Sequence, residues 1–320
     1  MTFLIQQAKL ALLIFALIIF SGCISSKPTI IKSGTVQLDI VEASPFVFNG
    51  KLYQVEWMRA GNYLRIVDRE SGKEISRLGY AHAFPCVFVE DGIVYVVGTK
   101  LNRASGGNTL TIFTSKNIIT WSEKVIFDNP DYVLFNTSLT KTKDGYVMSI
   151  EVNNLSKEAP ASFAARFLES KDLKSWRLLP RVYSHGYDRY TAPHLLRWVN
   201  GWYYLFYLEA GKPTGYEQFI TRSRDLINWE YSLLNPVLAA SPQDKYIKNK
   251  FLTAQDVEKI SNAENINNSD IDFIYFNDRL IISYSWGNQS GAEFLAQAEY
   301  LGSEKVFLES WFLNEKSTAN

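Results

Sequence analysis

One seven-residue phrase occurs three times in this chain and constrains the fold more than any other feature. The copies occupy Ser115–Trp121, Ser170–Trp176 and Ser223–Trp229, which lie 55 and 53 residues apart. A second phrase, an apolar strand ending in glutamate, runs in step with the first and ends at Glu56, Glu151 and Glu209. A fixed period of this size is typical of repeat architectures. We therefore expect a ring of similar sheets with acids at equivalent points around one central pocket.

Tight turns divide the chain into five units. The turns are Asn49-Gly50, Asp91-Gly92, Asp144-Gly145, Asn200-Gly201 and Asn277-Asp278. Pairs of this kind between apolar runs favour two-residue hairpins, and the aromatic content of 14% suits pleated sheets. Four-stranded units repeated about an axis form a propeller. We predict an all-β fold over residues 39–314, a five-bladed β-propeller of four-stranded antiparallel blades, followed by a tail at 315–320.

One segment departs from this strand pattern. Residues 242–265 are polar, and Ala254–Ile260 has helical spacing. We predict a short helical insertion before the last blade. A helical fold for the whole chain is disfavoured, because turns containing glycine recur throughout and helical periods are absent elsewhere.

The N-terminus has the layout of a secretory signal peptide over residues 1–22. Lys9 precedes the apolar run Leu10–Phe20, and two small residues lead to Cys23. This ending resembles the lipobox of bacterial lipoproteins, which implies cleavage before Cys23 and lipidation of its thiol. The alternatives are an uncleaved anchor and an ordinary signal peptide. We expect a lipid-anchored protein of the bacterial cell envelope, at the outer membrane or periplasmic face, with a tether over 23–38.

The charge balance, the cysteines and the histidines limit which partners and metal ions the chain is expected to bind. Lys plus Arg and Asp plus Glu both number 33, without a long basic run, so we expect no nucleic acid partner. After lipidation of Cys23 only Cys86 remains, in an apolar stretch typical of a buried thiol. The three histidines lack zinc-site spacing. We expect no metal, no cofactor and a monomer.

The repeated units resemble the five-bladed propellers of glycoside hydrolase family 43 and its relatives, families 32, 62, 68 and 117. The stretches Arg189–His194, Asn267–Asp272 and Ser285–Leu295 resemble an uncharacterised branch of that group, and the likeness covers almost all of the mature chain. The resemblance implies an inverting glycosidase acting on a poly- or oligosaccharide. Its two catalytic aspartates and one glutamate fall here on Ala43-Ser44-Pro45, Thr137 and Ala192. The standard family acids are therefore missing.

Other carboxylates are predicted to replace them. Glu56, Glu151 and Glu209 end second strands, which return to the face where inner strands begin, and Asp270 begins the inner strand of the last unit. We expect these four catalytic candidates to converge on one pocket, where crowding separates their pKa values. Asp270 and Glu209 are the predicted acid–base pair, with Glu56 and Glu151 tuning charge or binding hydroxyls. The alternative is that the glutamates pair with arginines as struts between blades.

Polar and aromatic companions complete the predicted sugar site, since such sites combine hydrogen-bonding groups with an aromatic face. The candidates for substrate binding are Arg59, His82, Asn136, Tyr190, Asn268, Trp286, Asn288 and Gln289. Trp286 is the candidate platform for a sugar ring, and His82 could stand in for a missing acid.

Two other functional classes stay open at this point. A non-catalytic surface glycan-binding lipoprotein would have the same pocket without a proton donor. A polysaccharide lyase would need a base and a neutralising cation for a uronate, which Tyr190, His82 and Arg59 could supply.

Overall fold

The computed structural model describes residues 27–102, 106–153, 163–210, 215–289 and 291–312. The described chain is predominantly β, and the strands that follow β1 first form three separate antiparallel sheets in chain order. The first contains β2 (Ala43–Phe48), β3 (Lys51–Met58), β4 (Tyr63–Asp68) and β5 (Glu74–Leu78). The second contains β6 (His82–Glu90), β7 (Ile93–Lys100), β8 (Thr109–Ser115) and β9 (Ser122–Asp128). The third contains β10 (Val133–Thr142), β11 (Gly145–Asn153), β12 (Ala164–Ser170) and β13 (Trp176–Leu178), with β14 (Ser184–His185) also paired to β12.

The remaining strands form an eight-stranded sheet in two parts. One part contains β15 (Leu195–Val199), β16 (Trp202–Ala210), β17 (Tyr216–Ser223) and β18 (Glu230–Tyr231). The other contains β19 (Asn267–Phe276), β20 (Arg279–Gly287), β21 (Glu293–Tyr300) and the N-terminal β1 (Ile31–Leu38). A single parallel contact between Tyr216 and Asn267 joins the parts. The first and last strands of the described chain are thus neighbours.

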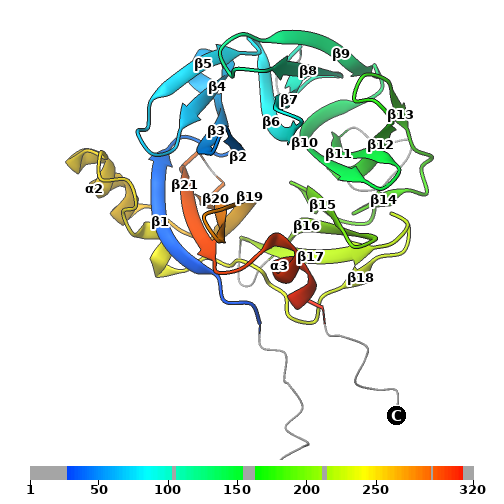
Figure 1. Ribbon diagram of the computed structural model, residues 1–320. Coiled ribbons are helices and arrows are strands. Elements are labelled where there is room, and N and C mark those ends of the chain that lie inside the picture. Colours follow the sequence, from blue (N-terminus) through cyan, green and yellow to red (C-terminus); the bar gives the residue numbers. More distant parts are fainter. Residues whose placement is uncertain (1–26, 103–105, 154–162, 211–214, 290, 313–320) are drawn as a thin grey trace, which may run out of the picture.

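The sheets are arranged about a common centre, as Figure 1 shows. Their innermost strands contact one another in the order β2, β6, β10, β15 and β19, and β19 contacts β2 again. Groups at the starts of these strands are therefore brought together although they lie far apart in the sequence.

The predicted tether over residues 23–38 is wrong in its C-terminal part. Residues Ile31–Leu38 pair antiparallel with β21, and Gly34 and Thr35 also contact the chain at Tyr246 and Ile247. Pairing satisfies the backbone groups along the edge of β21, which would otherwise stay open. The signal peptide, Cys23 and the predicted tail lie outside the described residues.

Local sequence explains the hairpins and the repeated phrase. Asn49 and Gly50 have φ of 48° and 72°, the left-handed geometry that a type I′ turn needs at both central positions. In the second copy of the phrase, the Asp172 carboxylate accepts the backbone amides of Lys174 and Ser175, both at 2.8 Å. Asp172 is therefore a turn residue whose carboxylate caps local backbone amides.

Four helical segments accompany the strands: η1 (Arg59–Gly61), η2 (Pro242–Lys245), α2 (Ala254–Asn262) and α3 (Glu304–Ser310). The predicted insertion is confirmed by α2, which begins with a reciprocal capping box between Thr253 and Asp256. Helix α3 was not predicted; it buries Phe307 and Leu308 in the largest hydrophobic cluster.

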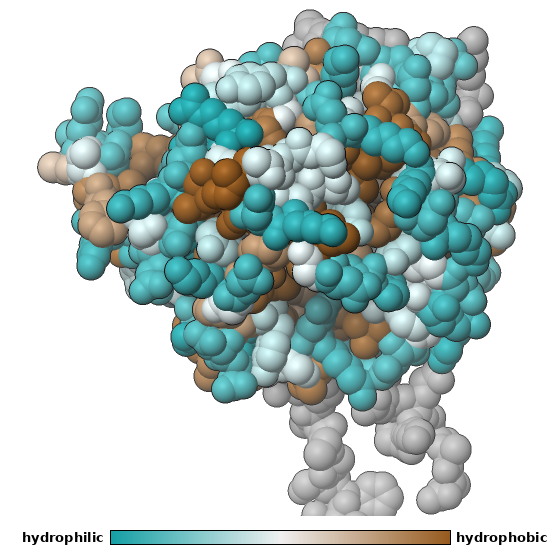
Figure 2. Space-filling view, turned by 45° about the horizontal axis from the view of Figure 1, so that its top comes forward, coloured by the Kyte–Doolittle hydropathy of each residue, from teal (hydrophilic) through white to brown (hydrophobic). Residues whose placement is uncertain are grey.

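Within the described ranges, no helix has the length and apolar character needed to cross a membrane. The face in Figure 2 is mostly hydrophilic, with apolar residues in small separate patches.

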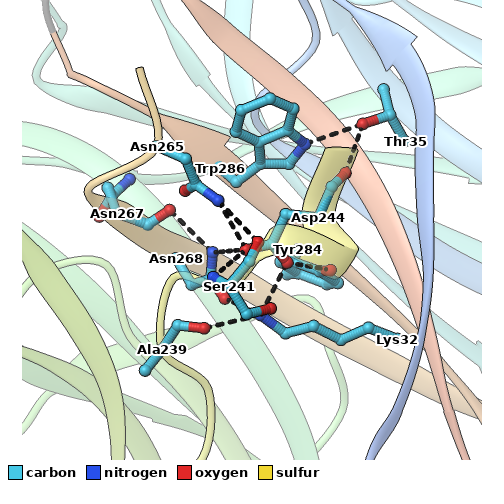
Figure 3. Close-up of polar contacts among 10 residues, drawn as sticks. All are labelled: Lys32, Thr35, Ala239, Ser241, Asp244, Asn265, Asn267, Asn268, Tyr284 and Trp286. Carbon is cyan, nitrogen blue, oxygen red and sulfur yellow. Dashed lines mark hydrogen bonds and ion pairs between the residues drawn. The ribbon is translucent and has the colours of Figure 1, made fainter. Parts of the chain in front are cut away.

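A buried polar network holds β1, η2 and the last sheet together (Figure 3). At its centre is the fully buried Asp244, which forms an ion pair of 2.7 Å with Lys32. Its carboxylate also accepts hydrogen bonds from Tyr284 at 2.7 Å, Asn265 at 2.9 Å and Asn268 at 3.2 Å. Five donors around one carboxylate, including the Ser241 amide at 2.8 Å, offset the cost of burying its charge.

Candidate active site

A small cavity lies where the innermost strands begin. Its volume is about 40 Å³, comparable to the space that one water molecule occupies. Every innermost strand or its leading residue contributes to the wall: Ala43-Ser44, Pro85-Cys86, Asn136-Thr137, Pro193–Leu195 and Asp270–Asp272. Two of the positions that match the missing family acids, Ser44 and Thr137, therefore line this cavity without supplying a carboxylate.

Four other carboxyl groups form a cluster near the cavity, and two of them, Glu42 and Asp270, line its wall. Glu42 directly precedes β2, Glu151 lies in β11, Asp270 in β19 and Glu293 at the start of β21. Asp270 is close enough for its charge to raise the pKa of each of the other three. Residues of three separate sheets thus bring their acids together, and Glu151 and Asp270 are among them, while their catalytic roles stay predictions.

Burial is the main cause of the altered acidity of these groups. It raises the pKa of Glu151 to about 8 and those of Glu42 and Glu293 to about 7. The negative charge of Asp270 adds to the rise in each case. At neutral pH the cluster therefore holds protons as well as charge, which is the condition for having a donor and an acceptor side by side.

Asp270 differs from the others in how its charged form is stabilised. Burial raises its pKa, but hydrogen bonds from Ser269 at 2.7 Å and Ser285 at 2.9 Å, with the charge of Arg59, act in the opposite direction. Asp270 has a φ of 51° within a bulge between Ser269 and Asp272. Bulges of this kind redirect a side chain, and a left-handed non-glycine residue is uncommon outside functional or turn positions.

Polar groups reach the remaining acids. The Asn136 amide donates to Glu151 Oε2 at 2.9 Å, and the Arg59 guanidinium lies 3.4 Å from the Glu42 carboxylate. Glu293 Oε2 is buried without a hydrogen-bond partner among the described residues. Tyr190 is 37% exposed, and after burial the charges of Glu151 and Asp270 are the main causes that raise its pKa. Arg59, Asn136 and Tyr190 therefore lie near the carboxyl cluster, and Asn136 also lines the cavity, while their binding of substrate stays a prediction.

Glu56 and Glu209 do not join the cluster. Glu56 is bound by Arg65 at 2.7 Å and by Gln54 at 2.7 Å, in a groove between the first sheet and β1. Glu209 accepts three hydrogen bonds from Arg189, two from Nε at 2.8 and 3.1 Å and one from Nη2. The predicted convergence is wrong for these two, because arginines hold both carboxylates. The pairs do not link blades as the strut alternative expected, since Arg65 lies opposite Glu56 within the first sheet and Arg189 precedes β15, the neighbour of the strand that carries Glu209.

Three predicted binding residues belong to the interior instead. His82 is buried against Phe113 and bonds to Thr111 through Nε2 at 3.0 Å. Trp286 is fully buried, stacks on Phe294 and donates to Thr35, so it offers no surface to a sugar. Asn268 belongs to the network around Asp244. These predictions are wrong, because the three side chains are buried in contacts with residues distant in sequence and cannot reach a substrate.

The loop before β21 lies at the edge of the site. The Gln289 backbone bonds to the Glu293 carboxylate, and Asn288 Oδ1 accepts the Ala292 amide at 3.4 Å. The loop thus shapes the site through its backbone, whereas substrate binding by the Asn288 and Gln289 side chains remains a prediction. No group of three or more His, Cys, Asp or Glu side chains within the described ranges is arranged to hold a metal ion.

Sequence reasoning missed two acids. Glu42 stands immediately before Ala43-Ser44-Pro45, the stretch that matches the family's base position. This adjacency could have identified Glu42 from the sequence, because Glu42 lies only two residues before Ser44, the position that matches the family's catalytic base. Glu293 begins a third strand, and nothing in its sequence context distinguishes it from other strand-starting glutamates.

No family model and no curated protein sequence matches the chain. Solved structures do match. A complex of BT0996 with RGII is 15% identical, with a TM-score of 0.62 over 86% of this protein and 92% of the other. The catalytic domain of the Coprinopsis cinerea GH62 α-L-arabinofuranosidase is 12% identical, with a TM-score of 0.59 over 86% and 98%. The GH43 endo-arabinanase from Bacillus licheniformis is 12% identical, with a TM-score of 0.53 over 83% and 96%. At these identities the likeness establishes a shared fold, and so confirms the predicted resemblance at the level of fold.

Proposed function

We propose that this protein is a glycoside hydrolase built on a five-bladed β-propeller and acting on a poly- or oligosaccharide. The observation that carries the proposal is the cluster formed by Glu42, Glu151, Asp270 and Glu293, of which Glu42 and Asp270 line the central cavity. The names of the structural neighbours, which include an arabinofuranosidase and an endo-arabinanase, support the same chemistry. Fold alone does not determine activity, so the carboxyl cluster is the decisive support.

The different surroundings of Glu151 and Asp270 indicate which of them acts as the acid and which as the base. Glu151, with a pKa of about 8, is protonated at neutral pH and can donate its proton to the leaving glycosidic oxygen. The Asp270 carboxylate accepts hydrogen bonds from two serine hydroxyls, and it can take a proton from the attacking water. Water then adds to the anomeric carbon as the glycosidic bond breaks, which inverts configuration. This mechanism requires carboxyls roughly 6.5–9.5 Å apart. Glu151 thus replaces Glu209 as the partner of Asp270 in the predicted acid–base pair.

Paired variants test the proposal. Asp270→Asn and Glu151→Gln are expected to lower kcat by about 10² to 10⁴, the usual contribution of acid–base groups. Glu230→Gln, in an exposed pair with Arg222, is the matched control and should keep full activity. The substrates are a panel of aryl glycosides and oligosaccharides. Undiminished turnover in both pocket variants would reject these roles. Glycan binding by the wild type without hydrolysis would favour the non-catalytic binding lipoprotein.

The lyase alternative has less support. It needs a base and a cation for a uronate, but His82 is buried beside Thr111 and Arg59 already faces Glu42. Burial and the charges of Glu151 and Asp270 raise the pKa of Tyr190, which disfavours it as the base. An unsaturated product absorbing in the ultraviolet would restore it.

We further propose that lipidated Cys23 anchors a monomer at the bacterial cell envelope. In the register of β1, Leu38 pairs with Phe294, next to Glu293 of the carboxyl cluster, whereas Ile31 pairs with Glu299 at the far end of β21. The chain therefore enters the fold on the side opposite the carboxyl cluster, and an anchored protein would present its pocket away from the membrane. Cys23→Ser should move the protein from the membrane fraction to the soluble fraction, and retention in the membrane would contradict the anchor.

A further inference from the structure

Aromatic rings form a continuous arc beside the carboxyl cluster. The arc consists of Trp57, Phe84, Phe135, Phe163, Tyr190 and Tyr216, and consecutive ring centroids lie 5.0, 5.3, 4.9, 5.5 and 5.2 Å apart. Its members come from β3, β6, β10, the residue before β12, the segment before β15, and β17. Each successive sheet from the first to the fourth in chain order therefore supplies at least one ring.

Three members of the arc are tied to the acids. Arg59 lies over the Trp57 ring at 5.2 Å and reaches Glu42. Phe135 adjoins Asn136, whose amide holds Glu151. Tyr190 lies near Glu151 and Asp270, whose charges act on its hydroxyl. The arc therefore lies beside the carboxyl cluster, and the two border one site.

The rings are available for contact. Tyr190 is 37% exposed, and Trp57, Phe135, Phe163 and Tyr216 are partly exposed. Trp57 Nε1, on the arc, and Glu293 Oε2, in the carboxyl cluster, are buried and without hydrogen-bond partners among the described residues.

We propose that the aromatic arc is a binding wall for the apolar faces of uncharged glycosyl units, with Tyr190 as its exposed contact. The proposal rests on the proposed function, because it assigns a substrate class to that same site. A sugar ring has an apolar C–H side, which stacks on aromatic faces, and hydroxyl edges, which hydrogen-bond to carboxyl groups. A uronate is disfavoured. Four acids cluster beside the arc, and Arg59, the cation that lowers the pKa values of Glu42 and Glu293, is already paired with Glu42.

Binding measurements test the wall separately from catalysis. Calorimetric titration uses neutral arabino-, xylo- and galacto-oligosaccharides, with oligogalacturonides as the anionic set, in an Asp270→Asn background that prevents turnover. Tyr190→Ala is expected to weaken binding of a neutral oligosaccharide by about two- to tenfold, the range for one aromatic contact. Tyr190→Phe keeps the ring and should bind within about twofold of the parent. Tyr275→Ala removes a 44% exposed tyrosine at the turn end of β19, the end opposite to the one that carries Asp270, and is the matched control.

The outcomes separate the two proposals. Weaker binding in Tyr190→Ala alone supports the wall, and if the wild type then hydrolyses nothing, only the proposed function fails. Equal binding by Tyr190→Ala and its parent overturns the wall. Tighter binding of oligogalacturonides than of every neutral oligosaccharide overturns the substrate class even if hydrolysis is found. Failure of the folded protein to bind any member of the panel overturns the proposal as well.

Discussion

Replacing Glu151 by glutamine should stabilise the protein while it removes activity. The carboxyl is buried, and its pKa rises from 4.5 to about 8 on folding. Between these values the unfolded chain releases a proton that the folded protein keeps, so ionisation favours the unfolded state increasingly as pH rises. A glutamine cannot ionise in either state, and its amide oxygen can still accept the hydrogen bond from Asn136.

The size of the effect follows from the two pKa values. One pKa unit corresponds to about 1.4 kcal/mol. With 4.5 in the unfolded chain and about 8 in the fold, the variant should gain about 1 kcal/mol over the wild type near pH 5 and about 3 kcal/mol near pH 7. The wild type should lose this stability over the window from pH 4.5 to pH 8 and regain it on acidification.

Urea unfolding followed by tryptophan fluorescence, at several values between about pH 5 and pH 8, measures the difference directly. Glu230→Gln is again the control, because its carboxylate is exposed and paired with Arg222. A constant stability difference across this range, or a wild type that is more stable than Glu151→Gln near pH 7, would refute the argument from burial.

Three further perturbations address the frame around the site. Asp244→Asn removes the charge at the centre of the buried network and should lower the free energy of unfolding by about 3–5 kcal/mol, whereas Asp278→Asn, in an exposed turn, should change it little. Deletion of residues 1–38 removes β1 and leaves β21 with an open edge; we expect loss of cooperative thermal unfolding, and a sharp transition like that of the full chain would contradict this. Arg59→Gln should raise the pKa of Glu42 further in a carboxyl-resolved NMR titration, and Arg59→Lys should largely preserve it; an unchanged pKa in Arg59→Gln would show that this ion pair is weak.

The parts of the fold that were predictable have local causes. Asn49-Gly50 adopts a primed turn because of its own backbone preferences, and Asp172 caps amides two and three residues ahead. The helix Ala254–Asn262 carries its start signal in Thr253 and its period in the following residues. Such features need no distant partner, so the strand order and the insertion could be anticipated from the chain alone.

The site residues were harder, because equivalent sequence positions met different neighbours. Glu56, Glu151 and Glu209 all end second strands, yet arginines hold the first and the last while an asparagine holds the second. Trp286 looked suitable for stacking on a sugar but packs on Phe294 in the core. Contacts with residues distant in sequence decide which carboxylate pairs with an arginine and which aromatic ring is buried. The periodicity of the sequence does not specify these contacts.

By itself, the sequence determined a repeated all-β chain with acids placed regularly along it, because turns and strand patterns act over a few residues. Only the tertiary structure decided which acids meet. It joined Glu42, Glu151, Asp270 and Glu293 from three sheets and moved Glu56 and Glu209 into ion pairs. The physical reason is burial: a carboxyl acquires an altered pKa from the neighbours and the solvent exclusion that the assembled sheets impose, and those neighbours come from distant parts of the chain.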